Sequence, residues 1–147
     1  MQGIDSRCNL LYTATGLGDW EIVFLTVKGG HVASFAKKSF DTPDERRTPP
    51  NTTMELVHFG DRMVARVTYH PGWRWTKDIK PVAGTELCQV NHFAYVLSGR
   101  THVVMADGAE MDLGPGDVAI VPAGHDAWVV GDEPCVFLDF GGAARPE

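Results

Sequence analysis

The chain has 147 residues, 44% of them hydrophobic and 22% charged, which is enough for one domain with a sizeable core but not comfortably for two. The formal net charge is −6 and no run is rich in Lys and Arg, so we expect no nucleic-acid or anionic-membrane partner. Three cysteines at long spacings, without a long apolar run or an export signal, favour a reducing cytoplasm.

Residues 1–36 are interpreted as an N-terminal extension. Within it, the apolar stretch 21–27 is a candidate strand, and the alternative is that the whole zone is a loosely ordered leader. The fragment from Gly16 to Asp19 is similar to part of a dinucleotide-binding fingerprint. It lacks the third glycine and has no clear flanking strand and helix, so we assign it no role.

Residues 37–53 are polar, with three prolines and an Asp-Glu-Arg-Arg run, and are predicted to be a surface connector. Residues 54–141 then hold short apolar runs separated by turn signals such as Asp107-Gly108. The expected strands are 55–59, 62–70, 93–98, 101–106, 109–113, 118–122, 127–130 and 135–140. Regularly spaced short strands predict an all-β sandwich or barrel, with little room for a helix between residues 93 and 140.

Six motifs of the chain occur together in one known group of proteins. They are F-x-x-PDE with two arginines at 40–47, PGWRW at 71–75, KPVAGT at 80–85, YVLSGR at 95–100, GPGD at 114–117 and PAGHDAWVVGDEP at 122–134. In these motifs the sequence resembles small single-domain bacterial members of the cupin superfamily. The resemblance implies a cupin jelly-roll β-barrel over 54–141 and a homodimer paired through edge strands. It is less specific for a reaction, because one barrel hosts many chemistries.

The resemblance also implies where metal ligands would lie: a His-x-His pair, a Glu about four residues later, and a His after the P-x-G turn. This sequence departs from that pattern at every position. Glu86 and Cys88 occupy the His-x-His positions, His92 the Glu position and Ala127 the last one, with His125 two residues earlier. The replacements still include side chains that bind metals.

Spacing supports a rearranged site. Glu86, Cys88 and His92 are separated by two and four residues, so an uninterrupted strand would direct all three to one face. His125 has the same parity as Ala127, and would point to the same side nearer the start of its strand. We therefore predict a divalent ion held by Glu86, Cys88, His92 and His125. A thiolate with imidazoles and a carboxylate favours zinc, iron or copper over magnesium.

Each candidate ligand also has a structural explanation. Cys88 could be a small buried hydrophobe, Glu86 a solvated side chain and His92 a hydrogen-bonded core histidine. His125 lies in a predicted turn, where exposure is the default. The histidines without a supporting constellation, to which we assign no role, are His31, His58, His70 and His102.

Trp73 and Trp75 are two residues apart, so on a strand they would face the same way and could wall a ligand cavity together with His92 and His125. The alternative is that the two indoles fill the core or a dimer face, which is the commoner fate of tryptophan in a small β-protein. Core filling is the favoured account.

Three functions remain open, since the sequence has no nucleophile elbow, no phosphate-binding Gly-Lys-Ser/Thr loop, no His-Glu-x-x-His and no Cys-x-x-Cys. The first is a small-molecule-binding cupin with an altered metal site, whose ligand contacts Trp73, Trp75, His92 and His125. The second is a metal-dependent enzyme of the dioxygenase or isomerase type. The third is a structural or partner-binding barrel with a filled interior.

Overall fold

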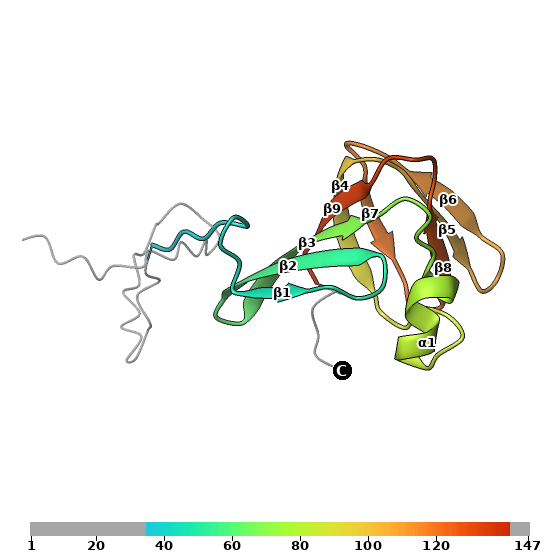
Figure 1. The fold of residues 1–147 in the computed structure, drawn as a ribbon, viewed down its shortest axis with the longest axis horizontal. Coiled ribbons are helices and arrows are strands. Elements are labelled where there is room, and N and C mark those ends of the chain that lie inside the picture. Colours follow the sequence, from blue (N-terminus) through green and yellow to red (C-terminus); the bar gives the residue numbers. More distant parts are fainter. Residues whose placement is uncertain (1–34, 142–147) are drawn as a thin grey trace, which may run out of the picture. The chain divides into compact units, whose positions relative to one another are not determined.

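The computed structural model describes residues 35–141, so the expected strand at 21–27 and the fragment from Gly16 to Asp19 lie outside the described residues. Over the described range the chain forms nine strands, a four-residue α-helix and a π-helical turn (Figure 1). None of the helices in this range is long and apolar enough to cross a bilayer.

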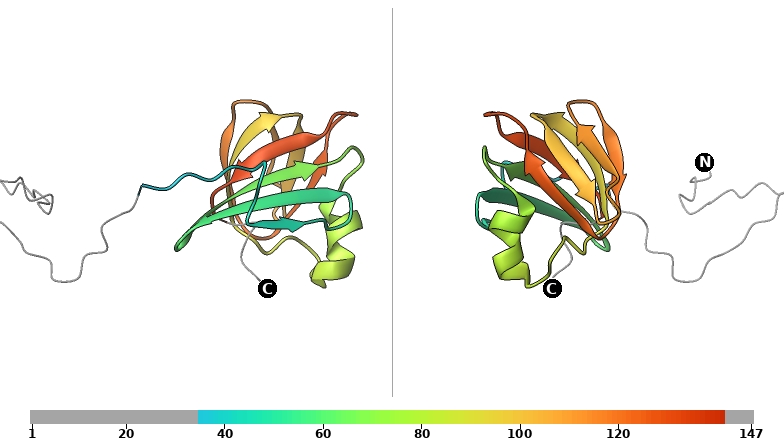
Figure 2. Two further views of the ribbon diagram at one scale, coloured as in Figure 1. Left: turned by 60° about the vertical axis from the view of Figure 1, so that its left-hand side comes forward. Right: turned by 90° about the vertical axis from the view of Figure 1, so that its right-hand side faces the viewer.

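The strands form two antiparallel sheets. Their bounds are β1 Glu45–Arg47, β2 Thr52–Phe59, β3 Arg62–Tyr69, β4 His92–Ser98, β5 Thr101–Met105, β6 Glu110–Leu113, β7 Val118–Val121, β8 His125–Val129 and β9 Cys135–Asp139. One sheet has the order β1-β2-β3-β9-β4-β7 and the other β6-β5-β8. Figure 2 shows β5 and β6 running at a steep angle to β2 and β3 of the larger sheet. This is the all-β jelly-roll architecture that the sequence predicts.

Alternation along the strands builds the core between the two sheets. In β4, for example, Ala94 and Val96 are buried whereas Phe93 and Tyr95 are exposed, because successive side chains point to opposite faces. Both sheets contribute to one hydrophobic cluster. Its members are Leu56, Ala65, Val67, Trp73, Trp75, Cys88, Ala94, Val96, Val103, Ala119, Val121, Ala127, Val129, Cys135 and Phe137.

The expected strands agree closely with β3 to β7 and β9, whereas β2 begins three residues earlier than expected, at Thr52 inside the predicted connector, where Thr52 pairs with Tyr69 of β3. Two further departures also have physical reasons. Glu45–Arg47 lies in the predicted connector but forms β1, since its backbone pairs with β2 and its polar side chains suit a sheet edge. The expected strand at 127–130 begins earlier, at His125, because β8 pairs with β5 as far as the His125–Met105 pair.

Residues 75–83 connect β3 to β4 through the π-helical turn η1 Trp75–Ile79 and the α-helix α1 Lys80–Ala83. Figure 1 shows α1 at one end of the sheets. Pro81 fits the first turn of α1, where no intrahelical N–H partner is needed. Gly84 ends the helix in the left-handed region, with φ 71°, and its N–H donates to the carbonyl of Lys80. Trp75 therefore lies in a helical turn and not on a strand.

Candidate metal centre

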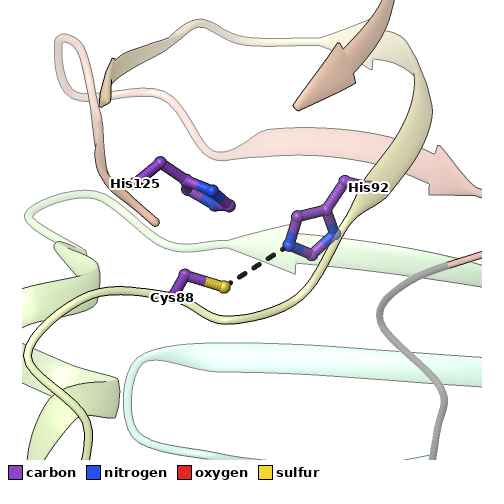
Figure 3. A group of neighbouring side chains, drawn as sticks. All are labelled: Cys88, His92 and His125. Carbon is purple, nitrogen blue, oxygen red and sulfur yellow. Dashed lines mark hydrogen bonds between the residues drawn. The ribbon is translucent and has the colours of Figure 1, made fainter. Parts of the chain in front are cut away.

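Three side chains of types that can bind metals point toward one another (Figure 3). Cys88 comes from the segment that leads into β4, His92 is the first residue of β4 and His125 is the first residue of β8. One potential ligand atom from each, a thiol sulfur and two ring nitrogens, lies within 4.8 Å of the other two. Cys88 and His125 are buried and His92 is partly buried. We call these three residues the Cys-His-His cluster.

Backbone pairing brings Cys88 to His125. The N–H of Cys88 donates to the carbonyl of His125 at 2.9 Å, and the N–H of Gly124 donates to the carbonyl of Cys88 at 2.6 Å. The segment before β4 is thus not the uninterrupted strand expected from the spacing, but it forms one isolated antiparallel bridge at the position of Cys88. That bridge fixes the thiol beside the start of β8.

Hydrogen bonds orient both imidazoles. His125 Nδ1 lies 2.6 Å from the carbonyl oxygen of Pro122, and because a carbonyl only accepts, this nitrogen donates. His92 Nδ1 lies 2.6 Å from Oδ2 of Asp139, while its Nε2 lies 3.6 Å from the Cys88 sulfur. In each ring Nδ1 is engaged outside the cluster, which leaves Nε2 as the nitrogen available for a metal.

The same contacts shift the acidity of the thiol and the imidazole. Burial raises the pKa of Cys88, but hydrogen bonds with His125 and His92 outweigh it and lower that pKa to about 6. Burial lowers the pKa of His92, but the hydrogen bonds with Asp139 and Cys88 raise it to about 9. Without a metal, the cluster therefore favours a thiolate beside an imidazolium at neutral pH.

The cluster opens into a cavity of about 50 Å³ between the two sheets. Most of its wall is apolar, and the polar side chains in it are two histidines, a tyrosine and a threonine. The lining residues are Tyr69, His92, Ala94, Val96, Thr101, Val103, Leu113, Val121, His125, Ala127 and Phe137. Burial raises the pKa of Tyr69 well above its usual value, so its phenol stays protonated and can donate a hydrogen bond.

The remaining predicted site residues lie elsewhere. Glu86 is exposed and forms an ion pair with Lys80 at 2.5 Å, away from the Cys-His-His cluster. Trp73 and Trp75 are buried in the hydrophobic core and are not among the residues that line the cavity. The Tyr69 ring stacks on Trp73 with the ring centroids 3.5 Å apart, so Trp73 forms a second layer behind the cavity wall.

Sequence reasoning missed two residues of the site, Tyr69 and Asp139. A signal for Asp139 exists in the apolar run of β9, where it shares parity with Cys135 and Phe137 and is therefore expected to point inward with them. A carboxylate directed into a core needs a partner, which in the structure is His92. Tyr69 has the same parity as the buried Val67 on β3.

A second carboxylate, Asp126, joins β8 to the segment before α1. Its Oδ2 accepts from Arg74 at 2.8 Å, and its Oδ1 accepts the backbone N–H of Thr76 at 3.1 Å. Arg74 also lies over the ring of Trp128, with 4.5 Å from the guanidinium carbon to the ring centroid. These contacts hold the neighbour of His125 against η1, and so stabilise the position of the cluster.

These observations define a small antiparallel β-barrel with a candidate metal centre in the wall of its cavity. Residues 81–141 match the Cupin domain family, and the chain contains a small domain of the cupin superfamily. None of the curated proteins matches the chain.

Two solved structures share the fold. A protein of unknown function from Rhizobium leguminosarum bv. viciae 3841 is 22% identical, with 74% of this chain and 96% of that chain covered and a TM-score of 0.54. The polyketide cyclase RemF from Streptomyces resistomycificus is also 22% identical, with 78% of this chain and 83% of that chain covered and a TM-score of 0.54. At this identity the two likenesses concern the fold alone.

Proposed function

We propose that this protein is a small-molecule-binding cupin whose ligand approaches a divalent metal ion held by Cys88, His92 and His125. The observation that carries the proposal is the convergence of three ligand atoms within 4.8 Å, two of them from residues that line a cavity. Three protein ligands would leave a coordination position of the ion free for a small molecule, which is the pattern of catalytic metal sites.

The donor set fits a borderline or soft metal ion. Zinc binds thiolate sulfur at about 2.3 Å and imidazole nitrogen at about 2.0 Å, so a sulfur and a nitrogen on one tetrahedral ion are about 3.5 Å apart. The Cys88 sulfur and His92 Nε2 are 3.6 Å apart, which requires almost no rearrangement of this pair. Zinc, iron or copper is therefore favoured over magnesium, which prefers oxygen ligands.

The cavity limits the ligand to a small molecule. A volume of about 50 Å³ is several times what one water molecule needs, but much less than a drug-sized pocket. The wall suits a short apolar body with one polar end that meets His92, His125 and the Tyr69 hydroxyl. Trp73 would support this ligand from behind Tyr69, and Trp75 would stabilise the core.

A metal-dependent enzyme of the dioxygenase or isomerase type is the second candidate, and the cavity beside His92 and His125 favours it. A divalent ion supplies Lewis-acid polarisation of a carbonyl or, if redox-active, activation of oxygen. The chain's own residues would orient the substrate, with the Tyr69 hydroxyl as donor and the apolar wall excluding water. Turnover in addition to binding would distinguish this candidate from the first.

Metal content of the tag-free protein tests the proposal. Elemental mass spectrometry should find close to one equivalent of zinc, iron or copper in the wild type, and little in Cys88→Ala or His92→Ala. Glu86→Gln is the matched control, because Glu86 is an exposed acidic residue outside the cluster, and this variant should keep its metal. A wild-type protein without metal even after reconstitution, or variants that retain it, would contradict the metal centre.

Ligand binding is tested separately by a thermal-shift screen of small carboxylates and small aromatics on the metal-loaded protein. A compound that binds the folded state should raise the melting temperature by mass action. A flat screen on a protein that does hold metal would leave the third hypothesis, a structural or partner-binding barrel, as the better account.

A further inference from the structure

Asp139 is a fully buried carboxylate at the end of β9, directly behind His92. Asp139 pairs with Ala94 on β4, and this pairing places its carboxylate near His92, the first residue of β4. Oδ2 accepts from His92 Nδ1 at 2.6 Å, and Oδ1 accepts the backbone N–H of Gly141 at 3.0 Å. Because both oxygens are engaged, the carboxylate is fixed in position and orientation.

The contact determines which nitrogen of His92 can bind a metal. A carboxylate accepts the Nδ1 proton, so it is Nε2 that would lose its proton and offer a lone pair when a metal ion replaces that proton. This Nε2 is the atom that faces the Cys88 sulfur. His125 is oriented in the same way, but by the uncharged carbonyl of Pro122. Asp139 is thus a charged partner for one imidazole of the cluster where the other has a neutral one.

We propose that Asp139 is a positioning residue of the metal centre: it holds His92 with Nε2 toward the ion and strengthens that nitrogen as a ligand. The inference rests on the proposed function, since it presumes that the Cys-His-His cluster holds metal. Carboxylate partners of metal-bound imidazoles act in this way, and their loss typically weakens metal affinity tenfold to a hundredfold. The negative charge also balances a divalent ion with a single thiolate ligand, which carries one net positive charge.

The chain offers a matched control pair on its surface. His102 Nδ1 lies 2.7 Å from Oδ1 of Asp112, nearly the same contact as that of His92 with Asp139, but His102 is outside the Cys-His-His cluster and Asp112 is exposed. Asp112→Asn removes a carboxylate from an imidazole without touching the cluster. It should therefore leave metal binding unchanged.

The test is a chelator-competition titration of zinc into metal-free wild type, Asp139→Asn and Asp112→Asn. We expect the zinc affinity of Asp139→Asn to fall tenfold to a hundredfold and that of Asp112→Asn to stay the same. Cobalt loading of Asp139→Asn should still give the sulfur-to-metal charge-transfer absorption of a Cys88 ligand, because the ion occupies the same site. A purely structural role for Asp139 would lower the melting temperature of the metal-free protein and leave the affinity of the folded fraction unchanged.

Equal zinc affinities in wild type and Asp139→Asn would overturn the inference and leave the proposed function standing. A wild type that binds no zinc would overturn both. If Asp139→Asn does not fold, nitrogen-15 NMR of the zinc-loaded wild type decides the matter. His92 should carry its proton on Nδ1 and the metal on Nε2, and coordination through Nδ1 would refute the role of Asp139.

Discussion

Two buried cysteines in the described residues have opposite acid-base environments. The Cys88 thiol lies beside two imidazoles, and their hydrogen bonds overcome the effect of burial, so that its pKa is about 6. Cys135 starts β9 inside the hydrophobic core, and burial raises its pKa to about 11. Burial acts on both thiols in the same direction, and the imidazoles make the difference. One thiol suits a metal ligand and the other is an inert core side chain.

The raised pKa of Cys135 predicts a loss of stability in alkaline solution. A group whose pKa is raised on folding contributes stability below its unfolded pKa, here near 9, and loses it as the pH rises toward 11. Between about pH 8 and about pH 10.5 the contribution of Cys135 to the free energy of unfolding should shrink by about 2 kcal/mol. Urea unfolding of wild type and Cys135→Ala at both pH values measures this. The difference in the free energy of unfolding between wild type and Cys135→Ala should fall by about 2 kcal/mol from the lower to the higher pH. The same difference at both pH values would contradict the prediction.

Residue spacing could predict the three residues of the Cys-His-His cluster but not Asp139, the carboxylate that supports His92. Cys88, His92 and His125 come from three different segments, and the isolated bridge between Cys88 and His125 helps to bring their ligand atoms together. Glu86 does not join them, since its segment is not a strand and its side chain pairs with Lys80 in solvent. Asp139 is far away in sequence, and its pairing with His92 depends on β9 lying next to β4, which local patterns do not determine.

The turn between β4 and β5 depends on a glycine that no other residue can replace without strain. Gly99 has φ 71°, a conformation that costs other residues about 1 to 2 kcal/mol. In addition, a Cβ at this position would overlap the backbone of Pro134 and lie 2.6 Å from Cα of Cys135. The turn therefore packs directly on the backbone that leads into β9.

Gly99→Ala should destabilise the protein by several kcal/mol, because backbone atoms cannot move aside as a flexible side chain can. Gly108 offers the matched control: it also has a positive φ, 89°, but a Cβ there would meet open space. Gly108→Ala should cost only the conformational strain, about 1 to 2 kcal/mol. Thermal or urea unfolding compares the two, and equal losses would show that the contact with Pro134 is not tight.

Most strands could be predicted because turn signals separate them almost regularly. Two elements, β1 and the helical segment 75–83, could not be predicted in this way. β1 has a polar sequence, and only its pairing with β2 makes it a strand. Residues 75–83 become helical, an element that the residue pattern did not predict. A buried Trp75 and the contacts of Asp126 with Arg74 and Thr76 fix the helical turn, and these interactions come from β8, about 50 residues away. Long-range contacts override local preference at this point.

At the scale of the whole molecule, β4 and β7 are apolar on both faces. Their inward residues fill the core, and their outward residues are exposed, as is the neighbouring phenylalanine after β9. This outer apolar face consists of Phe93, Tyr95, Leu97, Val118, Ile120 and Phe140. Phe93 pairs with Ile120, Tyr95 pairs with Val118, and the rings of Phe93 and Phe140 are 5.6 Å apart, so the side chains adjoin one another.

We propose that the outer apolar face is an interface between two copies of this chain. Its side chains expose on the order of 500 Å², at the upper end of what a monomer usually shows in one patch. A stable interface takes about 800 Å² from each partner, so the patch could form its centre with a polar rim around it. Among the described residues, β7 is also the last strand at one edge of the larger sheet. The homodimer implied by the sequence resemblance thus has a defined candidate surface.

Replacing Val118 and Ile120 together by Glu should convert a dimer to a monomer, because two carboxylates would have to be buried without partners. Size exclusion with light scattering at micromolar concentration would follow the change. Val82→Glu on α1 is the control, since Val82 is 66% exposed, comparable to 64% and 70% for Val118 and Ile120, but lies outside the outer apolar face. The control should stay dimeric. A monomeric wild type, or a double variant that still dimerises, would exclude this surface as the interface.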